Sequence, residues 1–104
     1  MSTTETRQEE AAVLGLDGEL TIYRAAELKQ QLLAALERAG PLEIDLSAVT
    51  EVDTAGVQLL MLAKQVALQR QQELRLAGHS PAVLDVFELF NLGGYFGDPL
   101  VIGA

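Results

Sequence analysis

Apolar residues recur at helical spacing in three segments of the chain, and short runs containing β-branched residues lie between them. Residues 24–39 carry apolar side chains at intervals of three and four, with charged and amide side chains on the other face, which predicts an amphipathic helix. A second helix is predicted from residue 53 or 54 to about residue 70, and a third over residues 80–92. Ser80 suits the N-cap of the third helix, and Pro81 suits its first helical position.

A β-hairpin is predicted before the first helix. Residues 11–16 form an apolar run, residues 19–22 form a second short strand, and the pair Asp17-Gly18 between them is a turn signal.

Two further strands are predicted between the helices, at residues 42–46 and 73–77, with residues 47–53 as a connecting loop. The pair Gly93-Gly94 is expected to end the third helix, and residues 100–102 would add an edge strand if they pair with the sheet. Strands that alternate with helices in this way predict an α/β layer structure with a largely parallel sheet, which the N-terminal hairpin would make mixed.

The charge balance narrows the choice of partner. With 104 residues the chain has room for one domain, expected over residues 11–104 after a flexible polar leader at residues 1–10. Lys and Arg number 7 against 15 Asp and Glu, which gives a net charge of −8. Nucleic acid and anionic membrane surfaces need a basic patch, so a protein partner fits better. The absence of a secretory signal pattern or an apolar run of membrane length indicates a cytoplasmic protein.

Few residues offer catalytic or metal-binding chemistry. The chain has no Cys and a single His, His79, which is interpreted as a turn residue beside the cap of the third helix. No glycine-rich phosphate loop of the Walker type is present. The carboxylates Asp45, Glu51 and Asp53 have no supporting His and make a weak case for Mg²⁺. We therefore expect no enzyme activity, no metal and no cofactor, with a small-ligand or nucleotide site at a helix terminus left as a third possibility.

The most informative segment, residues 42–60, runs from a strand into the second helix. Asp53 can cap the unpaired N–H groups of the first helical turn. Thr54 then holds its hydroxyl near the helix N-terminus, where an added phosphate is well stabilised. Gly56 removes side-chain bulk, which allows close approach by a partner backbone or by the neighbouring strand.

Residues 44–60 carry the pattern I-D-L-S-x-V-x-x-V-D-T-A-G-V-x-L-L, which resembles the signature of STAS domains, named for sulfate transporters and anti-sigma factor antagonists. The resemblance implies a mostly parallel sheet of four to five strands packed with three or four helices. It also implies a non-enzymatic switch that binds an anti-sigma factor or serine/threonine kinase and is released when Thr54 is phosphorylated. Ala55 departs from the pattern, because phosphorylated members usually have Ser or Thr there.

A related subtype offers an alternative. The Thr-Ala-Gly version also resembles the STAS subunit of a bacterial lipid-transport ABC complex, in which the domain binds the transporter ATPase and the Thr works at the contact. The alternative is therefore a constitutive accessory subunit of such a complex or of a chemosensory signalling complex. The oligomeric state stays open, as a monomer or a weak dimer.

The second helix also predicts a partner surface. Val57, Met61 and Leu68 line up with Thr54 on one flank, where they are either exposed to a partner or buried under the third helix. The predicted partner-binding residues are Asp53, Thr54, Gly56, Val57 and Met61. With Asp45, Glu51 and Asp53 expected nearby, a phosphate on Thr54 would enter a negative surface and disrupt binding by repulsion.

Overall fold

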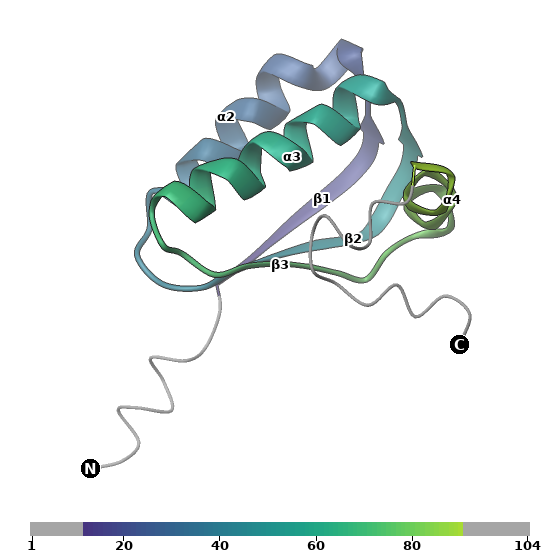
Figure 1. Ribbon diagram of the computed structural model, residues 1–104. Helices are drawn as coiled ribbons and strands as arrows, with labels where there is room; N and C mark the ends of the chain where they lie inside the picture. Colours follow the sequence, from purple (N-terminus) through teal and green to yellow (C-terminus); the bar gives the residue numbers. More distant parts are fainter. Residues whose placement is uncertain (1–11, 91–104) are drawn as a thin grey trace.

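Two helices lie over one face of a three-stranded sheet, and a third helix lies at one side, in the computed structural model, which describes residues 12–90 (Figure 1). Along the chain the elements are β1 (Ala12–Leu20), the 3-10 helix η1 (Ile22–Arg24), α2 (Ala25–Leu36), β2 (Leu42–Val52), α3 (Thr54–Gln69), β3 (Leu74–Ala77) and α4 (Pro81–Phe90).

The sheet has the strand order β1-β2-β3, and both neighbouring pairs are parallel. This confirms the predicted α/β fold with a parallel sheet. Residues 12–90 contribute three strands, fewer than the four to five expected. The predicted leader at residues 1–10, the Gly93-Gly94 helix stop and the strand at residues 100–102 lie outside the described residues.

The predicted N-terminal hairpin is wrong, because residues 12–20 form one continuous strand that pairs in parallel with β2. The Asp17-Gly18 pair lies between two shifts in the pairing register, and Gly18 has a φ of 71°. The guanidinium of Arg24 donates hydrogen bonds to the carbonyl oxygens of Asp17 and Glu19. The pair does mark a positive φ, but in an irregular stretch of a strand instead of a turn.

The predicted loop over residues 47–53 is also mostly strand, because β2 continues to Val52. The register places Leu46 and Ser47 of β2 opposite Leu16 alone, which is a β-bulge. The bulge breaks the alternation of buried positions, so that Leu46 and then Val49 point into the core. The alternation of apolar and polar residues therefore ends at the bulge, while the strand itself continues to Val52. For this reason the sequence pattern predicted a loop.

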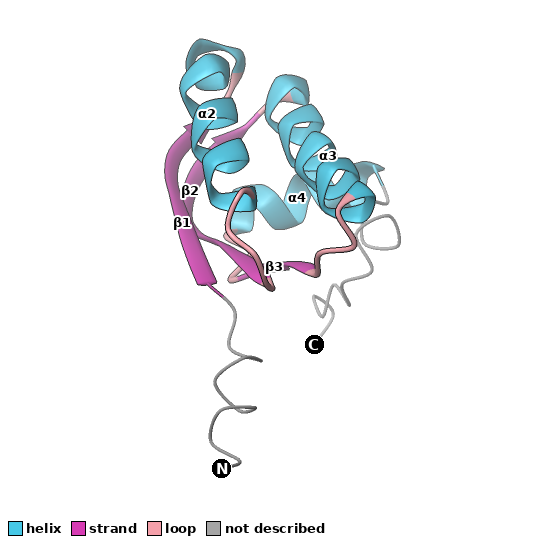
Figure 2. Ribbon diagram, turned by 90° about the vertical axis from the view of Figure 1, so that its left-hand side faces the viewer, coloured by secondary structure: helices cyan, strands magenta, loops and turns pink. Residues whose placement is uncertain are grey.

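Helices α2 and α3 pack against each other over the sheet, as the view from the side shows (Figure 2). Both begin and end within three residues of the predicted positions. The core between helices and sheet consists of aliphatic side chains, which include Leu28, Leu32 and Leu36 of α2, Leu60, Ala63 and Ala67 of α3, and Ile44 and Leu46 of β2. No helix within residues 12–90 has the length and apolar character needed to cross a membrane.

Helix α4 packs against β2 through Val83 and Phe87, which are fully buried. Ser80 caps this helix as predicted, because its hydroxyl oxygen accepts a hydrogen bond from the N–H of Val83 at 3.3 Å. The half-buried ring of His79 meets the ring of Phe87 edge to face, with the centroids 5.4 Å apart. The packing fits the interpretation of His79 as a structural residue of the turn before α4.

Candidate functional site

Asp53 joins the end of β2 to the start of α3, and its carboxylate ties the start of α3 to η1. One oxygen accepts a hydrogen bond from the N–H of Gly56 at 3.0 Å, which confirms the predicted N-cap of α3. The other oxygen accepts from the N–H of Ile22 in η1, also at 3.0 Å. The N–H of Asp53 itself donates to the carbonyl oxygen of Leu20 at 3.1 Å. The start of α3 is therefore fastened to the end of β1 and to η1.

These bonds also set the charge at this position. The backbone N–H of Ile22, and then that of Gly56, lower the pKa of the Asp53 carboxyl below its ordinary value of 3.8. Hydrogen bonds donated to a carboxylate favour its charged form, since the protonated acid is a weaker acceptor. At neutral pH the residue directly before Thr54 therefore carries a negative charge.

Gly56 lies where α3 comes closest to β1. A Cβ atom built on Gly56 would lie 2.1 Å from the carbonyl oxygen of Leu20, which is well inside van der Waals contact. Because the clashing atom belongs to the backbone, no rotation of a side chain relieves the overlap. Of the two reasons predicted for a glycine here, the geometry favours close approach by the neighbouring strand.

Thr54 is the first residue of α3, and its side chain is exposed. The described part of the chain has two other threonines, of which Thr21 is buried and Thr50 is exposed on β2. A hydroxyl in the first turn of a helix meets the positive end of the helix dipole, which favours a phosphate ester there. Thr54 is therefore accessible to a modifying enzyme and lies beside a negative charge.

The predicted partner surface on the flank of α3 is mostly buried in the part that lies next to Thr54. Val57 is only 7% exposed, and Met61 and Lys64 are half-buried. Leu68, at the far end of the same flank, is 63% exposed. Helix α3 packs against α2, β1, β2 and η1. The apolar surface that is open to solvent beside Thr54 comes from another element.

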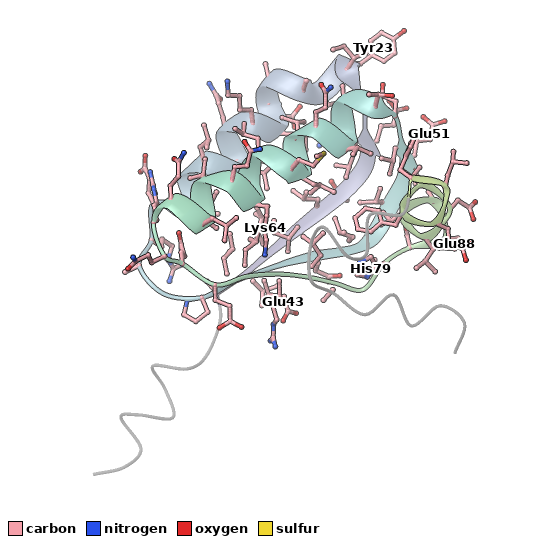
Figure 3. All side chains as sticks on the ribbon, in the orientation of Figure 1. Tyr23, Glu43, Glu51, Lys64, His79 and Glu88 are labelled. Atoms are coloured by element: carbon pink, nitrogen blue, oxygen red, sulfur yellow. The ribbon has the colours of Figure 1, made fainter. Side chains whose placement is uncertain are left out.

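Helix η1 forms an exposed apolar tip that sequence reasoning missed. Ile22 is 61% exposed and Tyr23 is 90% exposed, and the N–H of Ile22 is bonded to Asp53. Figure 3 shows Tyr23 projecting away from the body of the molecule at the end where α3 begins. The sequence assigned Ile22 to a strand, where alternation would have turned it inward. The strand instead ends at Leu20 and a 3-10 helix begins at Ile22, and both side chains are exposed there.

Three carboxylates were predicted near Thr54, and for one of them, Asp45, the prediction is wrong. Asp45 lies in the middle of β2, opposite Ala77 of β3, and accepts a hydrogen bond from the N–H of Ser47 at 3.0 Å. At about 3.3 Å per residue along a strand, Asp45 is roughly 25 Å from Asp53. Glu51 remains beside Asp53 at the end of β2. No set of three His, Cys, Asp or Glu residues within residues 12–90 is placed to hold one metal ion.

Comparison with known proteins gives a family match over almost the whole chain. The family model described as "Mlab, STAS domain" matches residues 3–102. Among solved structures, the anti-sigma factor antagonist SpoIIAA in its unphosphorylated form is similar, with a TM-score of 0.67 and 21% identical residues over 84% of this chain and 77% of that chain. At this identity the likeness concerns the fold. Among curated proteins, none matches the sequence significantly.

Proposed function

Since the chain belongs to the STAS domain family, we propose that it is a non-enzymatic protein-interaction switch of the anti-sigma factor antagonist type. In this proposal the domain binds a partner kinase or anti-sigma factor through the surface around Thr54, and phosphorylation of Thr54 releases the partner. The observation that carries the proposal is the exposed Thr54 at the first position of α3, directly after the capping Asp53.

The residues around Thr54 support a mechanism in which electrostatic repulsion releases the partner after phosphorylation. A phosphate ester adds about −1.5 to −2 charges near neutral pH. It would stand next to the carboxylate of Asp53, with Glu51 two residues earlier. A kinase that has just transferred a phosphate also carries a nucleoside diphosphate at the same contact. Two phosphate-bearing groups and a fixed carboxylate then share one interface, and their mutual repulsion favours dissociation.

The fold itself should survive this modification. Thr54 is exposed, and a negative group at a helix N-terminus interacts favourably with the helix dipole. In the proposed contact Asp53 orients Thr54, while the buried Gly56 and Val57 fix the shape of the first turn and Met61 adds a half-buried flank. Phosphorylation would therefore change the charge of the surface without unfolding α3.

The direct test is to incubate the protein with its cognate partner kinase and ATP and to locate phosphate by mass spectrometry. We expect one phosphate, on Thr54, and none on a Thr54→Ala variant. Thr50→Ala is the matched control, because Thr50 is also exposed but lies on a strand, and this variant should be phosphorylated like the native protein. A chain that gains no phosphate at Thr54, or gains it equally at Thr50, would overturn the switch.

The alternative is a constitutive accessory subunit, in which Thr54 serves only as a contact. Ala55 favours this reading, because it replaces the Ser or Thr usual after the phosphoacceptor. Binding measurements separate the two functions. Thr54→Glu should abolish partner binding in both cases, through charge in the switch and through a lost contact in the subunit. Thr54→Ala should retain binding in the switch and lose it in the constitutive subunit.

A further inference from the structure

An open groove lies at the end of the molecule that carries Thr54, between η1, the end of β2 and α4. Its volume is about 670 Å³, and it is lined by Glu19, Thr21, Tyr23, Thr50, Glu51, Val52, Asp53, Ala82, Asp85 and Val86. We call it the end groove. Figure 3 shows Glu51 and Tyr23 at this end of the molecule, with α4 beside them.

We propose that the end groove binds a cationic segment of the partner protein, with Arg or Lys side chains that alternate with apolar ones. This inference rests on the proposed function, because it names the chemistry of the partner segment that docks beside Thr54. It adds a contact that does not use the hydroxyl of Thr54.

The lining of the groove combines an apolar base with negative charge. Val52 and Val86 are half-buried, and the ring of Tyr23 is 90% exposed at one side. The four charged residues of the lining are all acidic, namely Glu19, Glu51, Asp53 and Asp85. Arg24 of η1 does not line the groove, and its guanidinium forms an ion pair with the carboxylate of Glu27, with a nitrogen–oxygen distance of 3.3 Å. A segment with positive and apolar side chains complements both features.

Two of these carboxylates are register partners in the sheet. Glu19 of β1 lies directly opposite Glu51 of β2 in the parallel pairing. Like charges at facing positions of neighbouring strands repel each other, and the pairing register brings Glu19 and Glu51 to such positions, while the hydroxyl of Thr21 donates a hydrogen bond to the Glu19 carboxylate at 3.4 Å. A cation placed between them would turn this repulsion into attraction. The guanidinium of an Arg suits the position, since its planar fork can bind two carboxylate oxygens at once.

The arrangement favours a chain of separated cations over a metal ion. No three acidic residues within residues 12–90 converge closely enough to hold a metal. The carboxylates come instead from β1, the end of β2 and α4, and are spread along the groove. Tyr23 beside them offers a ring face on which an Arg or Lys side chain can pack by a cation–π interaction.

The chain itself does not supply such a segment. Residues 91–104 contain one Asp and neither Lys nor Arg, and residues 1–11 contain one Arg against three Glu. A second copy of the chain would bring a further net charge of −8 to an acidic surface. Charge complementarity therefore selects a different protein as the occupant.

Binding of a labelled peptide with alternating Arg and Leu residues, followed by fluorescence anisotropy, tests the inference on the full chain. A peptide with Glu in place of Arg should not bind. The groove variant Glu19→Gln/Glu51→Gln should bind the Arg-Leu peptide at least about tenfold more weakly, which corresponds to about 1.4 kcal/mol. The matched control Glu37→Gln/Glu73→Gln removes the same charge at exposed positions outside the groove and should change binding less than about twofold.

Two further measurements make the outcome decisive. The groove variant should also be more stable to urea than the native chain, because it removes the repulsion between Glu19 and Glu51, so weaker binding cannot be ascribed to unfolding. The peptide assay contains neither kinase nor ATP, so its outcome does not depend on whether Thr54 is phosphorylated, and a failure of the groove can be told from a failure of the switch. An equal loss of binding in the groove and control variants, or no loss in either, would overturn the inference. Nuclear Overhauser contacts between the Tyr23 ring and residues 91–104 in the free protein would identify the chain's own tail as the occupant and also overturn it.

Discussion

At the residue scale, the two oxygens of the Asp53 carboxylate bind two different elements. It caps α3 through Gly56 and holds η1 through Ile22, so that the phosphoacceptor candidate Thr54 and the exposed tip are fixed to each other. Either oxygen alone would position only one of the two elements. A rigid relation between Thr54 and Tyr23 is what a partner surface built from both would require.

The pKa of Asp53 leads to a prediction on stability. Its folded-state pKa is lowered, so at acidic pH the unfolded chain binds more protons than the folded one. The stabilisation is complete above the unfolded pKa of 3.8 and is lost as the pH falls through the folded pKa. We expect Asp53→Asn and Asp53→Ser, which cap α3 without titrating, to lose less melting temperature between about pH 6 and pH 2.5 than the native protein does. Equal losses in all three proteins would show that Asp53 does not contribute.

Gly56 gives a second prediction at the same scale. Gly56→Ala should destabilise the fold by about 2 kcal/mol or more, because the new Cβ meets the Leu20 carbonyl oxygen at 2.1 Å, and this outweighs the helix propensity of about 1 kcal/mol that Ala gains. Gly15→Ala is the matched control, since a Cβ on Gly15 has no neighbouring atom within 4 Å. Urea unfolding should show a large loss for Gly56→Ala and a change of less than about 0.5 kcal/mol for Gly15→Ala.

At the element scale, α4 is a short helix with one face buried against β2 and the other exposed to solvent. Phe87 is fully buried and Phe90, three residues later, is 55% exposed. Phe87→Ala should cost about 3 to 5 kcal/mol of unfolding free energy, because it leaves a cavity between α4 and β2. Phe90→Ala should cost less than about 0.5 kcal/mol. Similar losses for the two variants, measured by chemical unfolding, would contradict the placement of this helix.

Strand β2 shows why element boundaries were harder to predict than elements. The helices follow a single period over 10 to 16 residues, so α2 and α3 were located closely. In β2 the bulge at Ser47 shifts the buried positions by one residue, and local periodicity then suggests a loop. The strand continues because β2 pairs with β1. The two strands are separated in the sequence by η1 and α2, so no local pattern reveals this pairing.

At the scale of the whole molecule, charge and shape act together. The net charge of −8 disfavours anionic partners for the molecule as a whole, and the end groove gathers four of the carboxylates around Val52 and Val86 at the end that carries Thr54. A diffuse charge guides the approach of a basic partner, whereas the groove decides where that partner docks.

This difference predicts a kinetic result. The association rate of the Arg-Leu peptide should fall by about tenfold or more when the salt concentration rises from about 0.05 to 0.5 M, because the screening length shortens to a few ångströms. The dissociation rate should change much less, since contacts inside the groove are shorter than that length. Stopped-flow measurements at several salt concentrations give both rates. A salt-independent association rate would contradict electrostatic guidance of this partner.

The sequence by itself determined the kind of fold, the three helices, the cap at Asp53, the cap at Ser80 and the family of the chain. These features depend on periodicity and on hydrogen bonds between residues close in the chain, which the order of residues already contains.

Only the tertiary structure decided the direction of β1, the length of β2, the distance of Asp45 from Thr54 and the exposure of Tyr23. Each of these depends on which strands pair and in which register, and a bulge of one residue changes the outcome. The partner surface that we propose therefore lies at the end of the molecule and not on the flank of α3, because residues far apart in the sequence meet there.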